Sequence, residues 1–301
     1  MGEHAIALNS VKLVRDHFTF GPLDLEIPKG YVTAIVGPNG SGKSTLFRMI
    51  MNTIKPQQGN VHVLGEQLDY DNDDELKQNI GYLQEEATTF DYFLKGSDKA
   101  AFHAKWFRGW NNDTYQRLIS NLTTRDDLQL KKMSKGMRRK FDLSLAMAHH
   151  PKLLLLDEPS SGLDPLAWKM MIEVLHQYME NEDHTVLMAT HIVDEVKRLA
   201  DYIVFLVDGQ VLGMYEKDEL LQSWSMYFVE ASAGSGFDVR QMPGYCEHKE
   251  VSTGFYEVIC SKSLEAERWL ETQVVTMRSK QILELDEILL QHMKKARLYA
   301  K

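Results

Sequence analysis

The sequence predicts an α/β protein whose main sheet is mostly parallel and is covered by helices on both faces. Three short apolar runs, at residues 31–36, 153–156 and 185–189, have the length and composition of buried parallel strands. Segments 165–180 and 193–201, which follow two of these runs, have helical patterns. This alternation of strands and helices is typical of a parallel sheet packed between helices.

The N-terminal part of the chain has a different pattern. Residues 6–14 and 23–27 have the composition of two strands, so we expect an antiparallel β-subdomain before the parallel sheet. Further on, aromatic and apolar residues recur at helical spacing from residue 92 to about residue 120. This spacing predicts a helical insert within about residues 88–150.

The pattern changes again after about residue 221. Strands are predicted at 227–231 and 244–260, and helices at 264–273 and 281–297. We therefore expect a main domain over residues 1–221 and a small α+β accessory domain over residues 222–301.

Composition limits the possible functions. The 301 residues include 34 Lys and Arg against 43 Asp and Glu, a net charge of −9, which argues against a nucleic-acid-binding protein. Cys246 and Cys260 match neither a zinc site nor a disulfide scaffold, and we expect reduced thiols. The N-terminus lacks the layout of a signal peptide, and no apolar run approaches the about 18 residues of a membrane span. These features predict a cytoplasmic chain that reaches a membrane only through a partner.

A glycine-rich segment follows the strand predicted at residues 31–36. It fits the pattern G-x-x-x-x-G-K-[ST] and precedes a predicted helix, which is the context that a phosphate-binding loop requires. Backbone N–H groups and the helix N-terminus cradle phosphate oxygens in such a loop. Lys43 is expected to reach the β- and γ-phosphates of a nucleotide and Ser44 to hold Mg²⁺; the alternative is a turn that binds nothing. The predicted nucleotide-binding residues are Gly37, Pro38, Asn39, Gly40, Ser41, Gly42, Lys43, Ser44 and Thr45.

Two acids follow the apolar run 153–156. Asp157, at the end of a buried strand beside the phosphate loop, is expected to hold Mg²⁺. Glu158 is then placed to orient and deprotonate an attacking water. The alternative is that Glu158 only caps the next helix. With the glycine-rich segment, the acids predict a P-loop NTPase.

Residues 133–137 narrow this class. They read Met-Ser-Lys-Gly-Met, and the segment resembles the signature of the ABC ATPase family, which has Leu-Ser-Gly-Gly-Gln at this place. Ser134 and Gly136 match that signature, whereas Met133, Lys135 and Met137 depart from it. The Ser-Lys-Gly-Met form is similar to that of bacterial ATPases related to antibiotic and peptide exporters. Ser134 and the N–H groups of a helix start would form a second phosphate cradle, although read alone the segment is a capped helix start.

The order of the following segments extends the resemblance. Residues 161–164, Ser-Gly-Leu-Asp, are similar to the D-loop of the family, and His191 takes the place of its switch histidine. The resemblance implies that His191 contacts the γ-phosphate and acts with Lys43 and Glu158 in catalysis. At the Q-loop, Glu85 occupies the slot of the family's glutamine and Gln84 lies one place early; either oxygen could reach Mg²⁺, and we favour Glu85.

The adenine-binding residue is less well defined by the sequence. An aromatic residue of the first strand region stacks on adenine in the family, and Arg15 stands in its place, with His17 and Phe18 nearby. Arginine can also stack on a base. Two alternatives are evenly matched. In one, Arg15 or His17 contacts adenine; in the other, the charge is solvated and Phe18 packs into the core.

The resemblance also implies partners. With one phosphate loop and one signature, the chain would bind ATP and Mg²⁺ between two ATPase subunits, in a homodimer or a heterodimer, and power an integral membrane permease from the inner face of the membrane. Transport is expected to be export, of peptides or antibiotics by analogy. Some of the insert's aromatics would line a groove for a permease helix, although core packing should account for more than half of them. The aromatics concerned are Phe90, Tyr92, Phe93, Trp106, Phe107 and Trp110.

Non-transport members of the family are the alternative function. The DNA-repair branch needs a long coiled-coil insertion, and too few residues separate Lys43 from Ser134 to supply one. The ribosome-acting branch carries two ATPase domains in one chain. A non-catalytic binding module would not need Glu158 and His191.

A hairpin is predicted in the accessory domain around residues 252–254. A three-residue loop ending in Gly254 would pair Val251 with Phe255, Lys249 with Glu257 and Cys246 with Cys260. The alternative is an irregular loop with two unrelated thiols.

Overall fold

The computed structural model describes residues 4–15, 17–69, 73–86, 89–232 and 236–299. Contacts divide the chain into two compact units, Met1–Met214 and Tyr215–Lys301, called here the N-terminal and C-terminal units. The sequence had predicted a domain boundary at residues 221/222. None of the helices that the structure describes combines the length and the apolar character needed to traverse a lipid bilayer.

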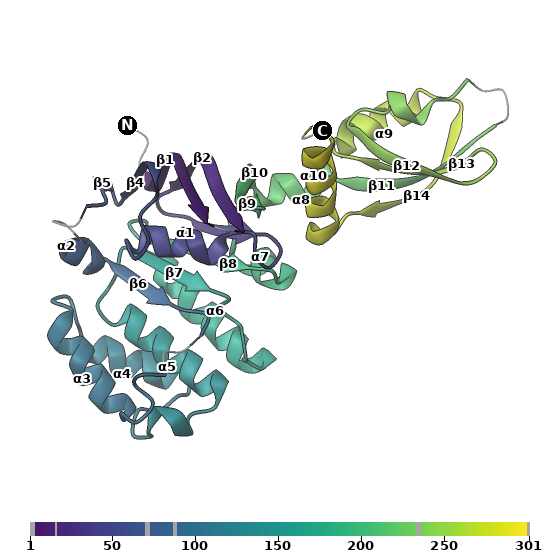
Figure 1. The fold of residues 1–301 in the computed structure, drawn as a ribbon. Helices are drawn as coiled ribbons and strands as arrows, with labels where there is room; N and C mark the ends of the chain where they lie inside the picture. The colour runs from purple at the N-terminus through teal and green to yellow at the C-terminus, as the bar shows by residue number, and fades with distance from the viewer. Residues whose placement is uncertain (1–3, 16, 70–72, 87–88, 233–235, 300–301) are drawn as a thin grey trace. The chain divides into compact units, whose positions relative to one another are not determined.

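A six-stranded sheet forms the centre of the N-terminal unit (Figure 1). Its order is β10-β9-β3-β8-β7-β6, and the strands from β9 to β6 pair in parallel. Every residue of β3, β7 and β8 is buried, which confirms the three predicted runs. The strands are β3 (Val32–Val36), β6 (Ile80–Leu83), β7 (Leu153–Asp157), β8 (Thr185–Thr190), β9 (Tyr202–Val207) and β10 (Gln210–Glu216).

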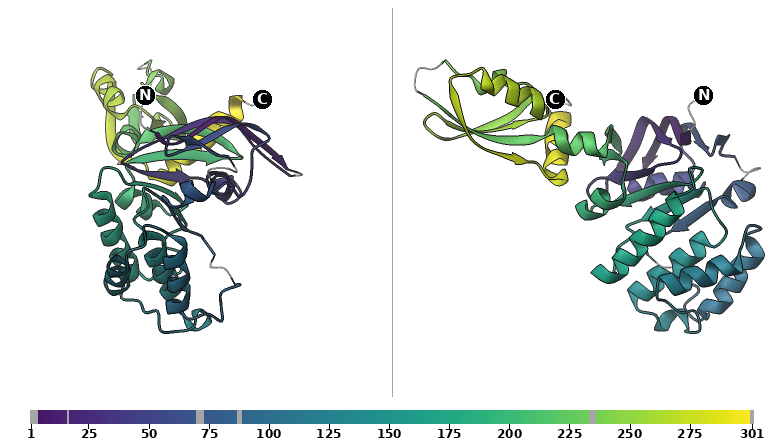
Figure 2. Two further views of the ribbon diagram at one scale, coloured as in Figure 1. Left: turned by 90° about the vertical axis from the view of Figure 1, so that its left-hand side faces the viewer. Right: turned by 180° about the vertical axis from the view of Figure 1, so that it is seen from behind.

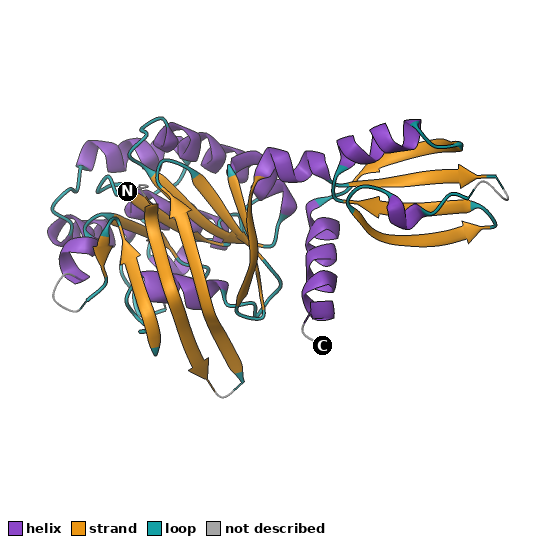
Figure 3. Ribbon diagram, turned by 90° about the horizontal axis from the view of Figure 1, so that it is seen from above, coloured by secondary structure: helices purple, strands orange, loops and turns teal. Residues whose placement is uncertain are grey.

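An antiparallel sheet of order β2-β1-β4-β5 forms the second layer, as the sequence predicted. Its long strands are seen from above in Figure 3. They are β1 (His4–Arg15), β2 (Phe18–Pro28), β4 (Gln58–Val63) and β5 (Glu66–Gln67).

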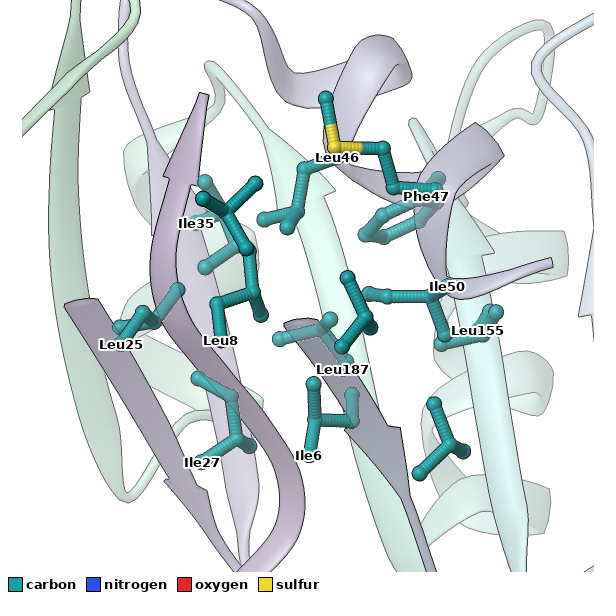
Figure 4. Packing of buried hydrophobic residues seen from close by; sticks show 14 of the residues in the cluster. Ile6, Leu8, Leu25, Ile27, Ile35, Leu46, Phe47, Ile50, Leu155 and Leu187 are labelled. Atoms are coloured by element: carbon teal, nitrogen blue, oxygen red, sulfur yellow. The ribbon is translucent and has the colours of Figure 1, made fainter. Parts of the chain in front are cut away.

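Helix α1 (Lys43–Ile50) packs between the two sheets. Its Leu46 and Phe47 are almost fully buried and meet Ile6 of β1 and Leu187 of β8 in one cluster (Figure 4). Burying side chains of this size contributes about 1.5–3 kcal/mol each. Because α1 starts directly after the glycine-rich segment, this packing fixes the helix end that faces the candidate site.

The helical insert consists of several short helices gathered at one end of the unit (Figure 2). The sequence predicted helical spacing from residue 92, but the first helix begins at Gly96, where Asp98 accepts the backbone N–H of Lys95 at 3.3 Å. A second helix starts after Asn111, whose side chain accepts the N–H of Thr114 at 2.9 Å. Besides α1, the described helices of the N-terminal unit, within the insert and outside it, are α2 (Asp73–Lys77), α3 (Gly96–Trp106), α4 (Asn112–Asn121), α5 (Lys135–Met147), α6 (Pro165–Met179), α7 (Val193–Leu199) and the 3₁₀ helix η1 (Leu130–Lys132).

The C-terminal unit is a four-stranded antiparallel sheet with helix α9 packed on one face. Tyr227 and Val258 from the sheet and Ala266 from α9 are fully buried in its core. The elements are α8 (Lys217–Ser223), β11 (Ser225–Ala231), η2 (Val239–Gln241), β12 (Tyr245–Ser252), β13 (Phe255–Cys260), α9 (Ser263–Glu271), β14 (Val275–Ile282) and α10 (Leu285–Tyr299).

The predicted hairpin exists, but its register is right only in the middle. Lys249 faces Glu257 as predicted, and Gly254 has the expected positive φ of 77°. The loop has two residues rather than three, and irregularities near both ends place Ser252 opposite Phe255 and Tyr245 opposite Cys260. The predicted pairs Val251–Phe255 and Cys246–Cys260 are therefore wrong, because each bulge shifts the register by one residue.

Strand β14 was also missed. The helix predicted from residue 281 begins only at Leu285, because Val275–Ile282 pairs along the edge of β11. Most of these strand residues are exposed and polar, so they lack the alternation that marks a half-buried strand.

Candidate functional site

The glycine-rich segment joins β3 to α1 at the carboxyl edge of the parallel sheet. Gly42 caps α1 with φ 110°, so no cap side chain accepts the N–H groups of the first turn. A Cβ on Gly40 would meet nothing within 4 Å, whereas one on Gly37 would lie 1.9 Å from the Leu206 carbonyl oxygen. The strand β9 therefore requires glycine at 37, and the first turn of α1, whose N–H groups no cap side chain accepts, fits a phosphate. Pro38, Asn39 and Gly40 are exposed, Ser41 is buried, and Ser44 and Thr45 are half-buried in the first turn of α1.

Lys43 lies buried beneath this loop. Its Nζ donates to the carbonyl oxygens of Gly37 at 2.7 Å and Pro38 at 3.2 Å. Burial lowers the pKa of Lys43, and the carboxylates of Glu158, Asp157 and Glu85 oppose that effect. The predicted phosphate-binding lysine thus lies close to three predicted acids.

Asp157 ends β7 and is almost fully buried. Burial, followed by repulsion from Glu85 and Glu158, raises its pKa to about 6. Crowded acids of this kind fit a site that is completed by a cation. No preformed cluster of three or more His, Cys, Asp or Glu ligands occurs among the residues that the structure describes.

Glu158 has an unusual backbone and a histidine partner. Its φ is 49°, and its N–H donates to the Ala189 carbonyl oxygen at 2.8 Å. The Nδ1 atom of His191 lies 2.9 Å from the Glu158 carboxylate, and the His191 side chain is 57% exposed. Glu158 does not cap the next helix, because Asp164 caps α6 by accepting the N–H of Ala167 at 2.8 Å.

Gln84 and Glu85 directly follow β6, which is the neighbour of β7 in the sheet. The Glu85 carboxylate affects the pKa of both Lys43 and Asp157, so its charge is near the centre of the site. The backbone carbonyls of Gln84 and Glu85 both accept hydrogen bonds from Arg139. The Arg139 contacts involve both residues alike, so which of the two side chains would reach Mg²⁺ stays a prediction.

The segment 133–137 lies at the start of α5. Ser134 is exposed and caps the helix by accepting the N–H of Met137 at 3.2 Å. Lys135 donates to the Ser161 hydroxyl at 2.9 Å, and a Cβ on Gly136 would meet the Gly162 carbonyl oxygen at 2.9 Å. In the part of the chain that the structure describes, no hydrogen bond or ion pair joins Ser134 to residues 37–45.

Comparisons with known proteins place these features in one family. The family model described as ABC transporter matches residues 20–161. The ABC transporter ATP-binding protein NatA of Bacillus subtilis is 31% identical over 222 residues, which cover 71% of this chain and 85% of NatA. The chain belongs to the family of ABC transporter ATP-binding proteins.

A curated relative and a solved structure extend the comparison of this ABC protein. The bacitracin transport ATP-binding protein BcrA of Bacillus licheniformis is 28% identical over 200 residues, or 66% of this chain, and the match spans 65% of the length of BcrA. A solved structure of the ATP binding subunit of an ABC transporter superposes with a TM-score of 0.65 at 24% identity, covering 72% of this chain and 92% of that chain. The α/β cassette fold predicted from the sequence is confirmed.

The region predicted to contact adenine lies at the β1–β2 turn. Phe18 packs against the main core, and a Cβ on Gly42 would lie 2.9 Å from the Phe18 ring. Arg15, which pairs with Phe18 across the turn, is exposed, as is His17. The packed Phe18 agrees with the alternative of a solvated charge beside a packed aromatic. Adenine contact by Arg15 or His17 stays a prediction.

Two buried charged residues of the site were missed by sequence reasoning. Arg139 of α5 is 4% exposed, and Glu195 of α7 is fully buried. Glu195 accepts the N–H of Ser160 at 3.2 Å, and burial raises its pKa. The available signal for Arg139 was its position one helical turn before the buried Leu143, on the apolar face of α5.

Proposed function

We propose that this ABC protein binds ATP with Mg²⁺, hydrolyses it to ADP and phosphate, and thereby powers transport through a separate membrane permease. The contact between Glu158 and His191, beside the phosphate loop with Lys43, is the observation that carries this proposal. Residues 37–45 would hold the phosphates through their N–H groups and the Lys43 ammonium.

The chemistry follows from the acids at the edge of the sheet. Ser44, Asp157 and either Glu85 or Gln84 would hold Mg²⁺, which when bound supplies positive charge to the β- and γ-phosphate oxygens. Glu158 would orient a water and take its proton as the water oxygen bonds to the γ-phosphorus and the bond to the β–γ bridging oxygen breaks. His191 would hold the γ-phosphate while its Nδ1 keeps the Glu158 carboxylate in place.

A second subunit would complete the site. Ser134 is exposed at a helix start and is not bonded to residues 37–45 among the described residues. In the proposed sandwich, Ser134 and Gly136 of one chain close over ATP that is held by the other. ATP then joins the subunits and hydrolysis releases them. Either two copies of this chain or this chain and a related one would serve.

The exposed aromatics of the insert support a permease contact. Phe93 is 75% exposed, Phe102 65% and Trp106 52%, an unusual concentration of apolar surface. Core packing was expected for more than half of the six aromatics named from the sequence, and this expectation is wrong. Phe107 and Trp110 are half-buried, stacked on His149 and packed near Tyr115, and the other four are exposed. We propose that this surface receives a permease helix at the inner face of the membrane, and, by likeness to the bacitracin protein, that the cargo is an exported peptide or antibiotic.

Substitution of Glu158 tests the hydrolytic proposal. Glu158→Gln removes the base and should lower the Mg²⁺-dependent rate by about 10²–10⁴-fold while ATP binding survives. The measurement is phosphate release beside binding of a fluorescent ATP analogue. A Glu158→Gln protein that turns over at the parent rate would exclude Glu158 as the base.

Co-purification from membranes tests the permease. The parent chain should carry an integral membrane subunit with it, and the Phe93→Ser, Trp106→Ser double variant should lose that subunit. Leu264→Ser, which changes a 69% exposed apolar residue of the C-terminal unit, is the matched control. A parent chain that brings down only soluble complexes would favour the non-transport alternative.

A further inference from the structure

Among the described residues, the hydrogen bonds of the Arg139 side chain all go to backbone carbonyl oxygens and none to a carboxylate. From the second turn of α5, its guanidinium donates to five backbone carbonyls. Nη1 reaches the oxygens of Gln84 and, at 3.0 Å, Glu85. Nη2 and Nε reach the oxygens of residues 157–159: Asp157, Glu158 at 2.6 Å and Pro159 at 3.2 Å. The planar fork with five N–H donors lets one arginine serve both segments at once.

Residues 84–85 and 157–159 lie just beyond the last hydrogen-bonded pair of strands β6 and β7. The parallel ladder between β6 and β7 ends at the pair Leu83–Leu156. The candidate ligands Glu85 and Asp157 and the candidate base Glu158 lie just beyond that pair. Arg139 supplies the donors that the ladder no longer provides, and it holds the carbonyl of Glu158, whose φ of 49° is rare for a residue other than glycine.

Arg139 also places a buried positive charge against this backbone. Burial lowers its pKa, and the carboxylates of Asp157, Asp142, Glu195 and Glu85 oppose that effect. The neighbouring Arg138 is equally buried but differs in its partners. It bonds Asp91 at 2.7 Å and Asp142 at 2.8 Å, in a cluster with Lys99. Among the described residues, it makes no hydrogen bond to a carbonyl of residues 84–85 or 157–159.

We propose that Arg139 is a positioning residue of the hydrolytic site, which fixes the backbone of Glu85 and of Asp157–Glu158 relative to each other. The inference rests on the proposed function and adds a residue to it. Arg139 bonds only the backbone of these segments, so it would act through the side chains proposed to hold the metal and the water. Because it belongs to the helix that Ser134 caps, it also joins the candidate signature to the candidate hydrolytic acids of the same chain.

The test uses the full chain with ADP and Mn²⁺ as the probe for the metal. Arg139→Gln should weaken Mn²⁺ binding to the ADP-bound chain by about 10-fold, the usual effect of losing a partner that orients metal ligands. ADP affinity in EDTA should stay within about twofold, because residues 37–45 are untouched. Arg139→Lys keeps the charge and loses the fork, so it should weaken Mn²⁺ binding to a similar degree.

Arg138→Gln is the matched control, since it removes an equally buried guanidinium from the next position. It should change the Mn²⁺ affinity by less than about twofold. The inference is overturned if both arginines weaken Mn²⁺ binding alike, or if Arg139→Lys lowers the melting temperature and leaves the Mn²⁺ affinity unchanged. Should Arg139→Gln not fold, the Arg139→Lys and Arg138→Gln comparison decides.

The proposed function fails in a different way. A parent chain that binds ADP and Mn²⁺ but never hydrolyses ATP would refute hydrolysis while the Mn²⁺ comparison still decides the role of Arg139. A parent chain that binds no nucleotide would refute both.

Discussion

Replacing Asp157 by asparagine should stabilise the nucleotide-free protein. The folded structure raises the pKa of this carboxyl from 3.8 to about 6, mainly by burial and then by repulsion from Glu85 and Glu158. The shift corresponds to about 3 kcal/mol of unfavourable free energy for the ionised form. The asparagine side chain has nearly the same shape and no charge, so the substitution should remove this penalty.

The sign of the effect depends on pH. Because the folded state binds the Asp157 proton more tightly than the unfolded state, Asp157 does not affect stability well below pH 3.8. Its destabilising effect grows as the pH rises from 3.8 and is complete above about pH 6. Asp157→Asn should therefore stabilise the chain by about 3 kcal/mol at pH 8 and by only about 0.5 kcal/mol at pH 4. For a unit of this size, 3 kcal/mol raises the melting temperature by about 6–12 °C.

Calorimetry of the full chain in EDTA measures this difference. The transition of the N-terminal unit is the one that moves when ADP is added. Asp183→Asn is the control, because Lys29 lowers the pKa of that exposed carboxyl and its loss is not expected to stabilise. With Mg²⁺ and ADP the parent chain should become more stable than Asp157→Asn, since the Asp157 carboxylate would then have a cation partner. An Asp157→Asn chain that is no more stable than the parent at pH 8, or whose advantage does not change with pH, would refute the reasoning.

Two further predictions concern the loop and the second subunit. Lys43→Ala and Ser134→Arg chains should each lack ATPase activity. Mixing them should restore part of that activity, because a mixed dimer keeps one intact composite site. Confirmed mixed dimers without ATPase activity would count against the two-subunit sandwich. Gly37→Ala should destabilise the N-terminal unit by about 3 kcal/mol or more, since its Cβ would lie 1.9 Å from the Leu206 carbonyl oxygen. Gly40→Ala, which has open space and a φ of 81°, should cost only about 1–2 kcal/mol in urea unfolding.

Much of the site could be predicted because its chemistry is encoded in short segments. A phosphate loop needs glycines, a lysine and a hydroxyl at fixed spacing between a strand and a helix, and Gly37, Lys43 and Ser44 supply them within nine residues. Asp157 and Glu158 follow a buried strand, whose neighbours in a parallel sheet end at the same edge. Local spacing therefore decided the fold class, the position of the loop and the acids.

Bulges, edge strands and partially exposed faces could not be predicted in the same way. The bulges of β12 and β13 depend on how each strand meets its neighbour, and they moved Cys260 opposite Tyr245. Strand β14 exists because β11 offers it an edge, although its own residues are mostly polar and exposed. Pairing energy that comes from another part of the chain leaves little trace in the segment itself.

The sequence by itself predicted the residues of the candidate site, and the tertiary structure decided which contacts hold them in place. Motif spacing predicts the roles of Lys43, Asp157 and Glu158, and the resemblance to the ABC ATPases predicts that of His191. Arg139 has no such motif, since its partners are backbone carbonyls of segments far away in the sequence. A carbonyl oxygen is present at every residue, so only the folded chain could show which ones a buried arginine binds.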